Sequence, residues 1–115
     1  MAEDVQKTIQ EFSTIQQQLQ MVMAQRQQLD AQIKENETSA AELEKSSGQA
    51  FRFVGSVMIQ QDKTTIKKDL AQELDELKGK VEFLERSEKK MAERFTTARK
   101  KLEELAKAQK ASGAI

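Results

Sequence analysis

Proline, cysteine, histidine, tryptophan and tyrosine are all absent from this chain of 115 residues. Without cysteine or histidine there is no disulfide, no thiol nucleophile and no imidazole base, and any metal site would consist of carboxylates alone. A glycine-rich phosphate-binding loop is missing as well. We therefore predict a protein that is not an enzyme, with no catalytic residue, no cofactor, no cofactor-binding residue and no metal ligand.

Aromatic residues are also scarce, at 4%, whereas charged residues make up 33% of the chain. Such a chain is not expected to build a self-sufficient globular core. No apolar run approaches the roughly 20 residues that a bilayer-spanning helix needs. The first ten residues lack the apolar centre of a secretory signal. These absences predict a cytoplasmic protein without a membrane partner.

Gln, Glu, Lys, Ala and Leu dominate what is present, and these residues lose little on entering a helix. The net charge is zero, but residues 1–48 carry a net charge of −4 and residues 49–115 carry +4, which favours pairing of the two halves. Basic clusters such as Lys89-Lys90 and Arg99-Lys100-Lys101 are interleaved with acids. This interleaving is typical of a solvent-exposed helix face, so we predict no nucleic-acid partner.

Apolar residues recur at steps of three and four in both halves, which is the spacing of a coiled coil. The first stripe comprises Val5, Ile9, Phe12, Ile15, Leu19, Val22, Leu29, Ile33, Ala40 and Leu43. Two successive three-residue steps around Phe12 indicate a slip between Phe12 and Ile15. The second stripe comprises Leu70, Leu74, Leu77, Val81, Leu84, Met91, Phe95, Ala98, Leu102 and Leu105.

The two stripes predict helices over about 4–46 and 63–110. Ser46-Ser47-Gly48 supplies a left-handed stop for the first helix, and Asp62 or Thr64 caps the second. The predicted fold class is all-α dominated: a long antiparallel coiled-coil hairpin in a single domain, 1–115. The two ends of the chain then meet at one tip.

Between the helices, residues 49–61 have the pattern of a β-hairpin. A two-residue turn at Val54-Gly55 would place Phe51 and Met58 on one face, and Arg52 with Val57 and Ile59 on the other. A three-residue loop, 54–56, would gather both phenylalanines with Val57 and Ile59, and we favour it because register usually follows the buried face. A two-stranded hairpin is marginal alone and its edges are unpaired, so it is predicted to be an assembly element.

Phe51 to Gly55 has the order hydrophobic, basic, hydrophobic, valine, glycine. An apolar strand follows, and then a helix begins near Asp62, in the stretch AFRFVGSVMIQQDKTTIKKDLAQELDELKGKVEFLERSEKKM. With a preceding helix and a basic last helix, this arrangement resembles the β-type subunit of prefoldin, in its archaeal form, over nearly the whole chain. Phe51 stands where that family more often has tyrosine, a difference that changes little in a buried strand.

The resemblance implies an ATP-independent chaperone, a holdase that captures unfolded proteins at coiled-coil tips and delivers them to a group II chaperonin. Its implied partners are α-type prefoldin subunits, in a hexamer of two α-type and four β-type chains whose hairpins form β-barrels, together with unfolded clients and the chaperonin.

Two sets of residues are candidates for these functions. The oligomerisation residues are Phe51, Phe53, Val54, Gly55, Val57 and Ile59. The client-binding residues at the tip are Val5, Ile9, Phe12, Leu102, Leu105 and Ile115. The same tip residues also have the spacing to close the last turns of the coiled coil. The alternative to the chaperone is a homodimeric coiled-coil scaffold or adaptor that holds no client, although this alternative does not account for the β-hairpin.

Overall fold

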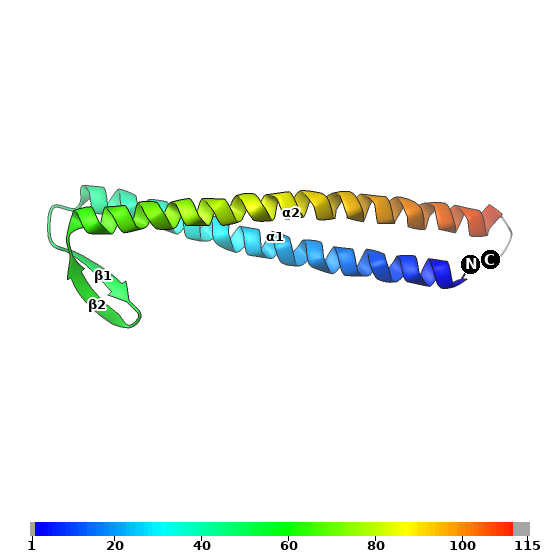
Figure 1. Cartoon of the computed structure of the whole chain (residues 1–115), viewed down its shortest axis with the longest axis horizontal. Helices are drawn as coiled ribbons and strands as arrows, with labels where there is room; N and C mark the ends of the chain where they lie inside the picture. Colours follow the sequence, from blue (N-terminus) through cyan, green and yellow to red (C-terminus); the bar gives the residue numbers. More distant parts are fainter. Residues whose placement is uncertain (1, 112–115) are drawn as a thin grey trace. The chain divides into compact units, whose positions relative to one another are not determined.

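The structure, a computed structural model, describes residues 2–111. Helix α1 (Ala2–Lys45) is followed by strands β1 (Ala50–Val54) and β2 (Val57–Gln61) and by helix α2 (Lys63–Ala111) (Figure 1). Two long antiparallel helices joined by one β-hairpin confirm the predicted all-α dominated fold class. Within residues 2–111, neither helix contains a segment long and apolar enough to cross a membrane.

Two compact units divide the chain. Of the described residues, the first contains 2–25 and 84–111, and the second contains 26–83. Each unit pairs part of α1 with part of α2, and the second also holds the β-hairpin. That the chain forms a single domain stays a prediction.

In the first unit, the stripe of α1 passes through Thr8 and not through Ile9. Thr8 is only 2% exposed, whereas Ile9 is 50% exposed. The Thr8 hydroxyl donates a hydrogen bond to the Asp4 carbonyl oxygen at 2.7 Å, so burying this side chain leaves no donor unsatisfied. The steps from Val5 to Ile15 then alternate regularly, and the predicted slip after Phe12 is wrong. Across the seam, the Phe12 and Phe95 rings lie 4.7 Å apart between centroids.

In the second unit, the stripe of α2 begins earlier than predicted, at Ile66, which is buried. Ile66, Leu70 and Leu74 are separated by two successive four-residue steps. An insertion of this kind locally unwinds a coiled coil. Opposite this region Asn36 is buried, and its Nδ2 donates a hydrogen bond to the Leu70 carbonyl oxygen at 3.1 Å. Helix α1 thus contributes a polar group, and not an apolar one, to this layer.

The end of α1 is not formed by a left-handed glycine. In the part of the chain that the structure describes, the only residue with positive φ is Gly55, so the left-handed stop predicted at Gly48 is wrong. Instead the Lys63 ammonium donates hydrogen bonds to the carbonyl oxygens of Glu44, at 3.2 Å, and Ser46, at 2.9 Å. A cation at this position satisfies carbonyls that the helix leaves without partners and complements its dipole.

The start of α2 agrees with the sequence. Asp62 directly precedes the helix, and its carbonyl oxygen accepts the first helical hydrogen bond, from the Ile66 amide at 3.0 Å. This is the position of an N-cap residue.

The hairpin has a register that differs from the one favoured from sequence. Val54 pairs with Val57, so the turn consists of Gly55 and Ser56, and Gly55 has a φ of 65°. Positive φ at the first central residue alone is the pattern of a type II′ turn, whose twist suits a two-residue hairpin. The three-residue loop is therefore wrong. The division of side chains between faces follows the other alternative, although the turn lies one residue further along the chain.

Candidate assembly and client-binding surfaces

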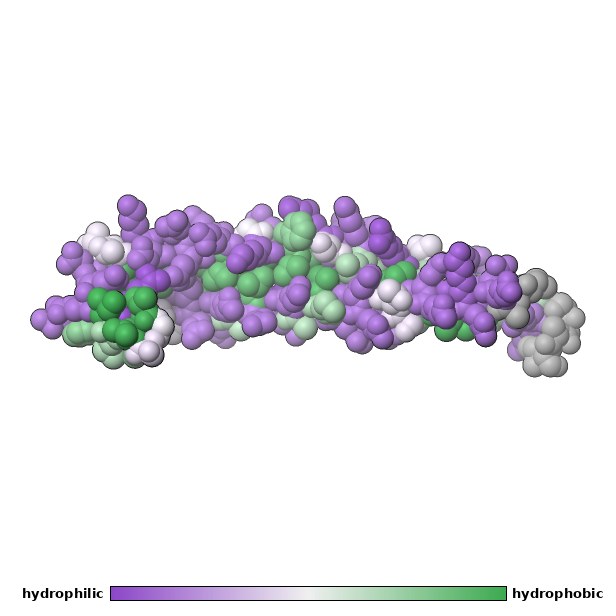
Figure 2. Space-filling model, turned by 60° about the horizontal axis from the view of Figure 1, so that its bottom comes forward, coloured by the Kyte–Doolittle hydropathy of each residue, from purple (hydrophilic) through white to green (hydrophobic). Residues whose placement is uncertain are grey.

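The β-hairpin exposes six large apolar side chains, which we call the hairpin surface. Their exposed fractions range from 41% to 66%. They are Phe51, Phe53, Val54, Val57, Met58 and Ile59. Figure 2 shows apolar atoms gathered over the hairpin among mostly hydrophilic surroundings. An apolar surface of this kind on a small chain is typical of a protein interaction site.

The register sorts these side chains onto two faces, because residues directly opposite each other in an antiparallel pair share a face. One face carries Phe51, Phe53 and Met58. The other carries Arg52, Val54, Val57 and Ile59. Since both faces are apolar, neither has the polar character of a face that remains in water.

The edges of the hairpin are also unsatisfied. Among residues 2–111, β1 and β2 pair only with each other, so each strand has one outer edge without a ladder. Free N–H and C=O groups along such an edge form a template for another strand. The hairpin therefore offers both apolar side chains and backbone hydrogen bonds to a partner.

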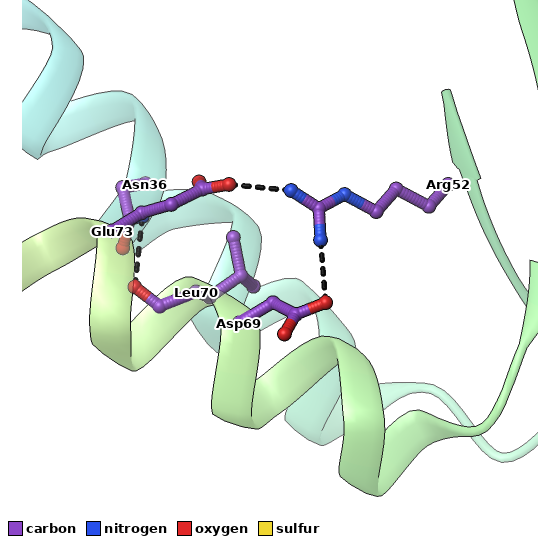
Figure 3. A network of polar contacts seen from close by, with 5 residues as sticks. All are labelled: Asn36, Arg52, Asp69, Leu70 and Glu73. Atoms are coloured by element: carbon purple, nitrogen blue, oxygen red, sulfur yellow. Dashed lines mark hydrogen bonds and ion pairs between the residues drawn. The ribbon is translucent and has the colours of Figure 1, made fainter. Parts of the chain in front are cut away.

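A single basic residue connects this hairpin to α2 (Figure 3). Arg52 Nη1 donates to Asp69 Oδ2 at 2.7 Å, and Arg52 Nη2 donates to Glu73 Oε1. Asp69 and Glu73 lie one helical turn apart on α2, so the planar guanidinium reaches both carboxylates at once. We call this contact the Arg52 clamp. All three side chains are partly buried.

The same turn of α2 is also held by α1. Asn36 donates to the carbonyl oxygen of Leu70, which lies between Asp69 and Glu73 (Figure 3). Residues 69–73 thus receive a side chain from β1 and another from α1. This turn links three of the four elements within the second unit.

The residues predicted to bind clients lie in the first unit and differ in exposure. Val5, Phe12, Leu102 and Leu105 are half-buried, and Ile9 is half exposed. Ile115 lies outside the described residues. The Phe12 ring packs on Phe95, so that pair contributes to the seam between the helices. Ile9 is the described member of the set that the seam does not cover.

A groove of about 700 Å³ lies beside Ile15 and Ala98 in the same unit. Its lining combines the apolar side chains of Ile15 and Ala98 with three basic and two acidic side chains. The lining residues are Glu11, Ile15, Lys90, Glu93, Arg94, Thr97, Ala98 and Lys101. Sequence analysis did not identify this groove, because its residues come from opposite ends of the chain and follow no single periodicity.

Electrostatic perturbation is concentrated where α1 ends and α2 begins. The ion pair with Lys67, and to a smaller degree the nearby Lys63 charge, holds the pKa of the Glu44 carboxyl below its ordinary value of 4.5. In the described part of the chain, no three acidic side chains converge in a way that could hold a metal ion. The chemistry that these surfaces support is therefore recognition through apolar contact, strand pairing and charge.

Three residues at or in contact with the hairpin surface were not predicted from sequence: Met58, Asp69 and Glu73. Met58 is excluded from the apolar face by the three-residue loop, so its assignment depended on the register. The two acids are spaced by four residues on a helix, and Arg52 is the only charge between Ala50 and Gln61. An isolated charge in an apolar strand needs partners, and that signal points to acids on a neighbouring helix.

Comparison with known proteins gives consistent matches over nearly the whole chain. A family model described as "Prefoldin subunit" matches residues 6–109. The prefoldin subunit beta of Archaeoglobus fulgidus is 30% identical over 103 residues, which are 88% of this chain and 89% of that protein. The prefoldin subunit beta of Methanococcoides burtonii is 31% identical over 102 residues, 87% of each chain.

A solved structure gives the same fold. The crystal structure of the prefoldin beta subunit from Thermococcus strain KS-1 matches with a TM-score of 0.81. The match covers 89% of this chain and 91% of that one, at 24% sequence identity. At this identity the structural match is evidence for the fold alone.

Proposed function

This chain belongs to the prefoldin family, as a subunit of the β type, and we propose that it acts as one chain of a hexameric, ATP-independent holdase. Prefoldin subunits are chaperone components and not enzymes. In the proposed mechanism, the β-hairpin joins hairpins of neighbouring subunits, with α-type chains among them, and the ends of the helices hold unfolded clients. The clients pass to a group II chaperonin in the cytoplasm.

The observation that carries the assembly part of the proposal is the hairpin surface with its unpaired edges. A two-stranded sheet with apolar side chains on both faces is marginal in water. Pairing with other hairpins would bury Phe53, Val57 and their neighbours and would complete the strand ladders. A homodimeric scaffold held only by its helices would leave this surface in solvent.

Substitution of Phe53 by aspartate tests the assembly interface. We expect Phe53→Asp to prevent entry into the hexamer, because burying an unpaired charge costs several kcal/mol. Native mass spectrometry of the chain mixed with the α-type subunit from the same organism measures the outcome. Phe83→Asp is the matched control, since Phe83 is 62% exposed and lies on α2 outside the hairpin. An intact hexamer of the Phe53→Asp chain would show that the hairpin is not the assembly site.

The client-binding part of the proposal is supported by exposed apolar surface in the first unit. Ile9 is exposed outside the seam, and the groove beside Ile15 and Ala98 is lined by both apolar and charged side chains. The terminal turns of a helix also unfold locally with ease, because they have few contacts to lose. Apolar groups at such positions can adapt to varied unfolded segments.

Serine substitutions at Val5 and Ile9 test this site. The hexamer carrying both changes should assemble normally and lose much of its capacity to suppress aggregation of a chemically denatured client. Light scattering at a fixed ratio of hexamer to client measures that capacity. Phe83→Ser is the control, and we expect it to retain the capacity of the parent. Equal suppression of aggregation by the parent, the double variant and the control would show that clients bind elsewhere, or would favour the alternative of a scaffold that holds no client.

A further inference from the structure

Arg52 is the only charged residue between Ala50 and Gln61. It occupies the middle of β1 and shares a face with Val54, Val57 and Ile59. A charge in the middle of an otherwise apolar assembly element is costly unless it is paired. The structure supplies two partners, both from the same chain.

The geometry of the Arg52 clamp is that of a directional link. Two N–H groups of one guanidinium reach two carboxylates spaced by one turn of α2, so both the distance and the angle of approach are constrained. A lysine at this position would offer a point charge without this planar fork. The partners are about as exposed as Arg52 itself, so the value of the contact lies more in its geometry than in its energy.

Few other polar contacts hold the hairpin in the structure. Among the described residues, Arg52 makes the side-chain hydrogen bonds that join the strands to the helices. The six apolar side chains of the hairpin surface are exposed and do not fix its orientation through burial. The turn that Arg52 reaches, residues 69–73, is itself held by Asn36 from α1.

We propose that Arg52 is a positioning residue for assembly, whose clamp on Asp69 and Glu73 sets the orientation of the β-hairpin on α2 before any partner subunit binds. The proposal deepens the assembly function and rests on it. A hairpin held in one orientation presents its edges and both faces to partners without a further ordering cost. A hairpin whose orientation varies must be ordered at each association step, and this ordering costs free energy. Loss of the Arg52 clamp therefore lowers the association constant.

Spin labels can measure the orientation directly, because the chain has no cysteine of its own. Cysteines introduced at the exposed positions Ser56 and Lys78 report the distance between the turn of the hairpin and α2, by pulsed electron paramagnetic resonance. We expect a narrow distribution in the parent and a broad one in Arg52→Met. The paired change Asp69→Asn with Glu73→Gln should broaden it likewise.

The same variants, without labels, are then mixed with the α-type subunit from the same organism. Each should associate about tenfold more weakly, a loss equivalent to one modest interaction. The matched control is Asp75→Asn with Glu76→Gln, which makes the same change of charge on α2 away from Arg52. This control should keep the narrow distribution and the parent association constant.

Reversal of the clamp distinguishes positioning from a general loss of stability. The chain with Arg52→Glu, Asp69→Lys and Glu73→Lys should recover part of the narrow distribution and part of the association. Unchanged distances in Arg52→Met, or broadened distances with unchanged association, would each overturn the inference. If the parent itself fails to associate, the proposed assembly function fails, while the distances still decide whether the clamp orients the hairpin.

Discussion

Two lysines at the start of α2 act on the last turn of α1. Lys63 donates to the carbonyl oxygens of Glu44 and Ser46, and Lys67 pairs with the Glu44 carboxylate. One residue therefore receives a hydrogen bond at its backbone and an ion pair at its side chain. Here charge performs the role that a C-terminal glycine performs in many helices.

The Glu44 pair should make stability depend on pH in a defined direction. The pKa of this carboxyl is lowered in the folded chain, so its contribution is complete above the ordinary value of 4.5 and is lost as pH falls through the lowered pKa. We expect Glu44→Gln to be less stable than the parent at pH 7, and the difference to be smaller at pH 3. Urea unfolding followed by circular dichroism at both pH values measures the difference.

Glu42→Gln is the control for this measurement. Glu42 Oε1 lies 3.9 Å from Lys45 Nζ, and both side chains are largely exposed. The Glu44–Lys67 pair is exposed as well, so its effect should be small, but a pair at 3.9 Å within one helix should contribute still less. A Glu44→Gln deficit of the same size at both pH values would mean that the effect is not electrostatic.

At the scale of the elements, three glycines occupy three different backbone environments. Gly55 needs positive φ in the turn, Gly48 lies in the link after α1, and Gly79 lies inside α2. A Cβ at Gly79 or Gly48 would meet no atom within 4 Å. The consequence of replacing each one therefore follows from the backbone alone.

Alanine substitutions should separate these environments. Gly79→Ala should stabilise the helices by about 1 kcal/mol, the difference in helix propensity. Gly48→Ala should be near neutral, and Gly55→Ala should disfavour the hairpin by about 1 kcal/mol or more. Urea unfolding measures the helices, and association with the α-type subunit measures the hairpin. Weaker association of Gly48→Ala than of Gly55→Ala would contradict the turn assignment.

The helices and the hairpin were predictable from sequence because periodicity and turn residues are local signals. The phase of the α1 stripe near its start was not, because Ile9 is more apolar than Thr8 and the threonine hydroxyl is satisfied within its own helix. The register of the hairpin also could not be settled. It depends on the twist of a Gly-Ser turn, and the six apolar side chains of the hairpin surface stay exposed in the chain, so no buried apolar face selects the register.

Part of the hairpin surface was likewise predictable. Five of its apolar residues follow from the strand pattern alone. The link from Arg52 to Asp69 and Glu73 did not follow, because it joins residues 17 and 21 positions apart and depends on where the hairpin lies on α2. In the sequence, the only sign of this non-local contact is the isolated charge of Arg52 within an apolar strand.

At the scale of the whole molecule, burial is limited. Ile66, Val81 and Ala98 are the buried apolar side chains among residues 3–110, for which burial is described, whereas nine large apolar side chains there are exposed. Each buried side chain contributes on the order of 1 to 3 kcal/mol, which must offset the entropy of ordering two long helices. The isolated chain is therefore expected to be marginally stable.

Assembly should raise the thermal stability of this chain. A partner that binds only the folded state stabilises it by mass action, so the unfolding midpoint becomes dependent on concentration. We expect the midpoint, followed by circular dichroism, to rise when the α-type subunit is added and to rise further with total protein concentration. Phe53→Asp should abolish the rise. The same midpoint with and without the α-type subunit would show that assembly does not complete the fold.

The antiparallel pairing of α1 with α2 has a consequence for how the chain is made. Synthesis proceeds from the N-terminus, so all of α1 leaves the ribosome before the residues that cover its stripe have emerged. The contact of Phe12 with Phe95 forms only after nearly the whole chain has been made, whereas the Asn36 hydrogen bond to Leu70 requires only 34 further residues. Nascent α1 thus carries an uncovered apolar stripe for most of the time of translation. A prefoldin subunit is thus, during its own synthesis, an incompletely folded polypeptide with exposed apolar surface, the kind of chain that chaperones protect.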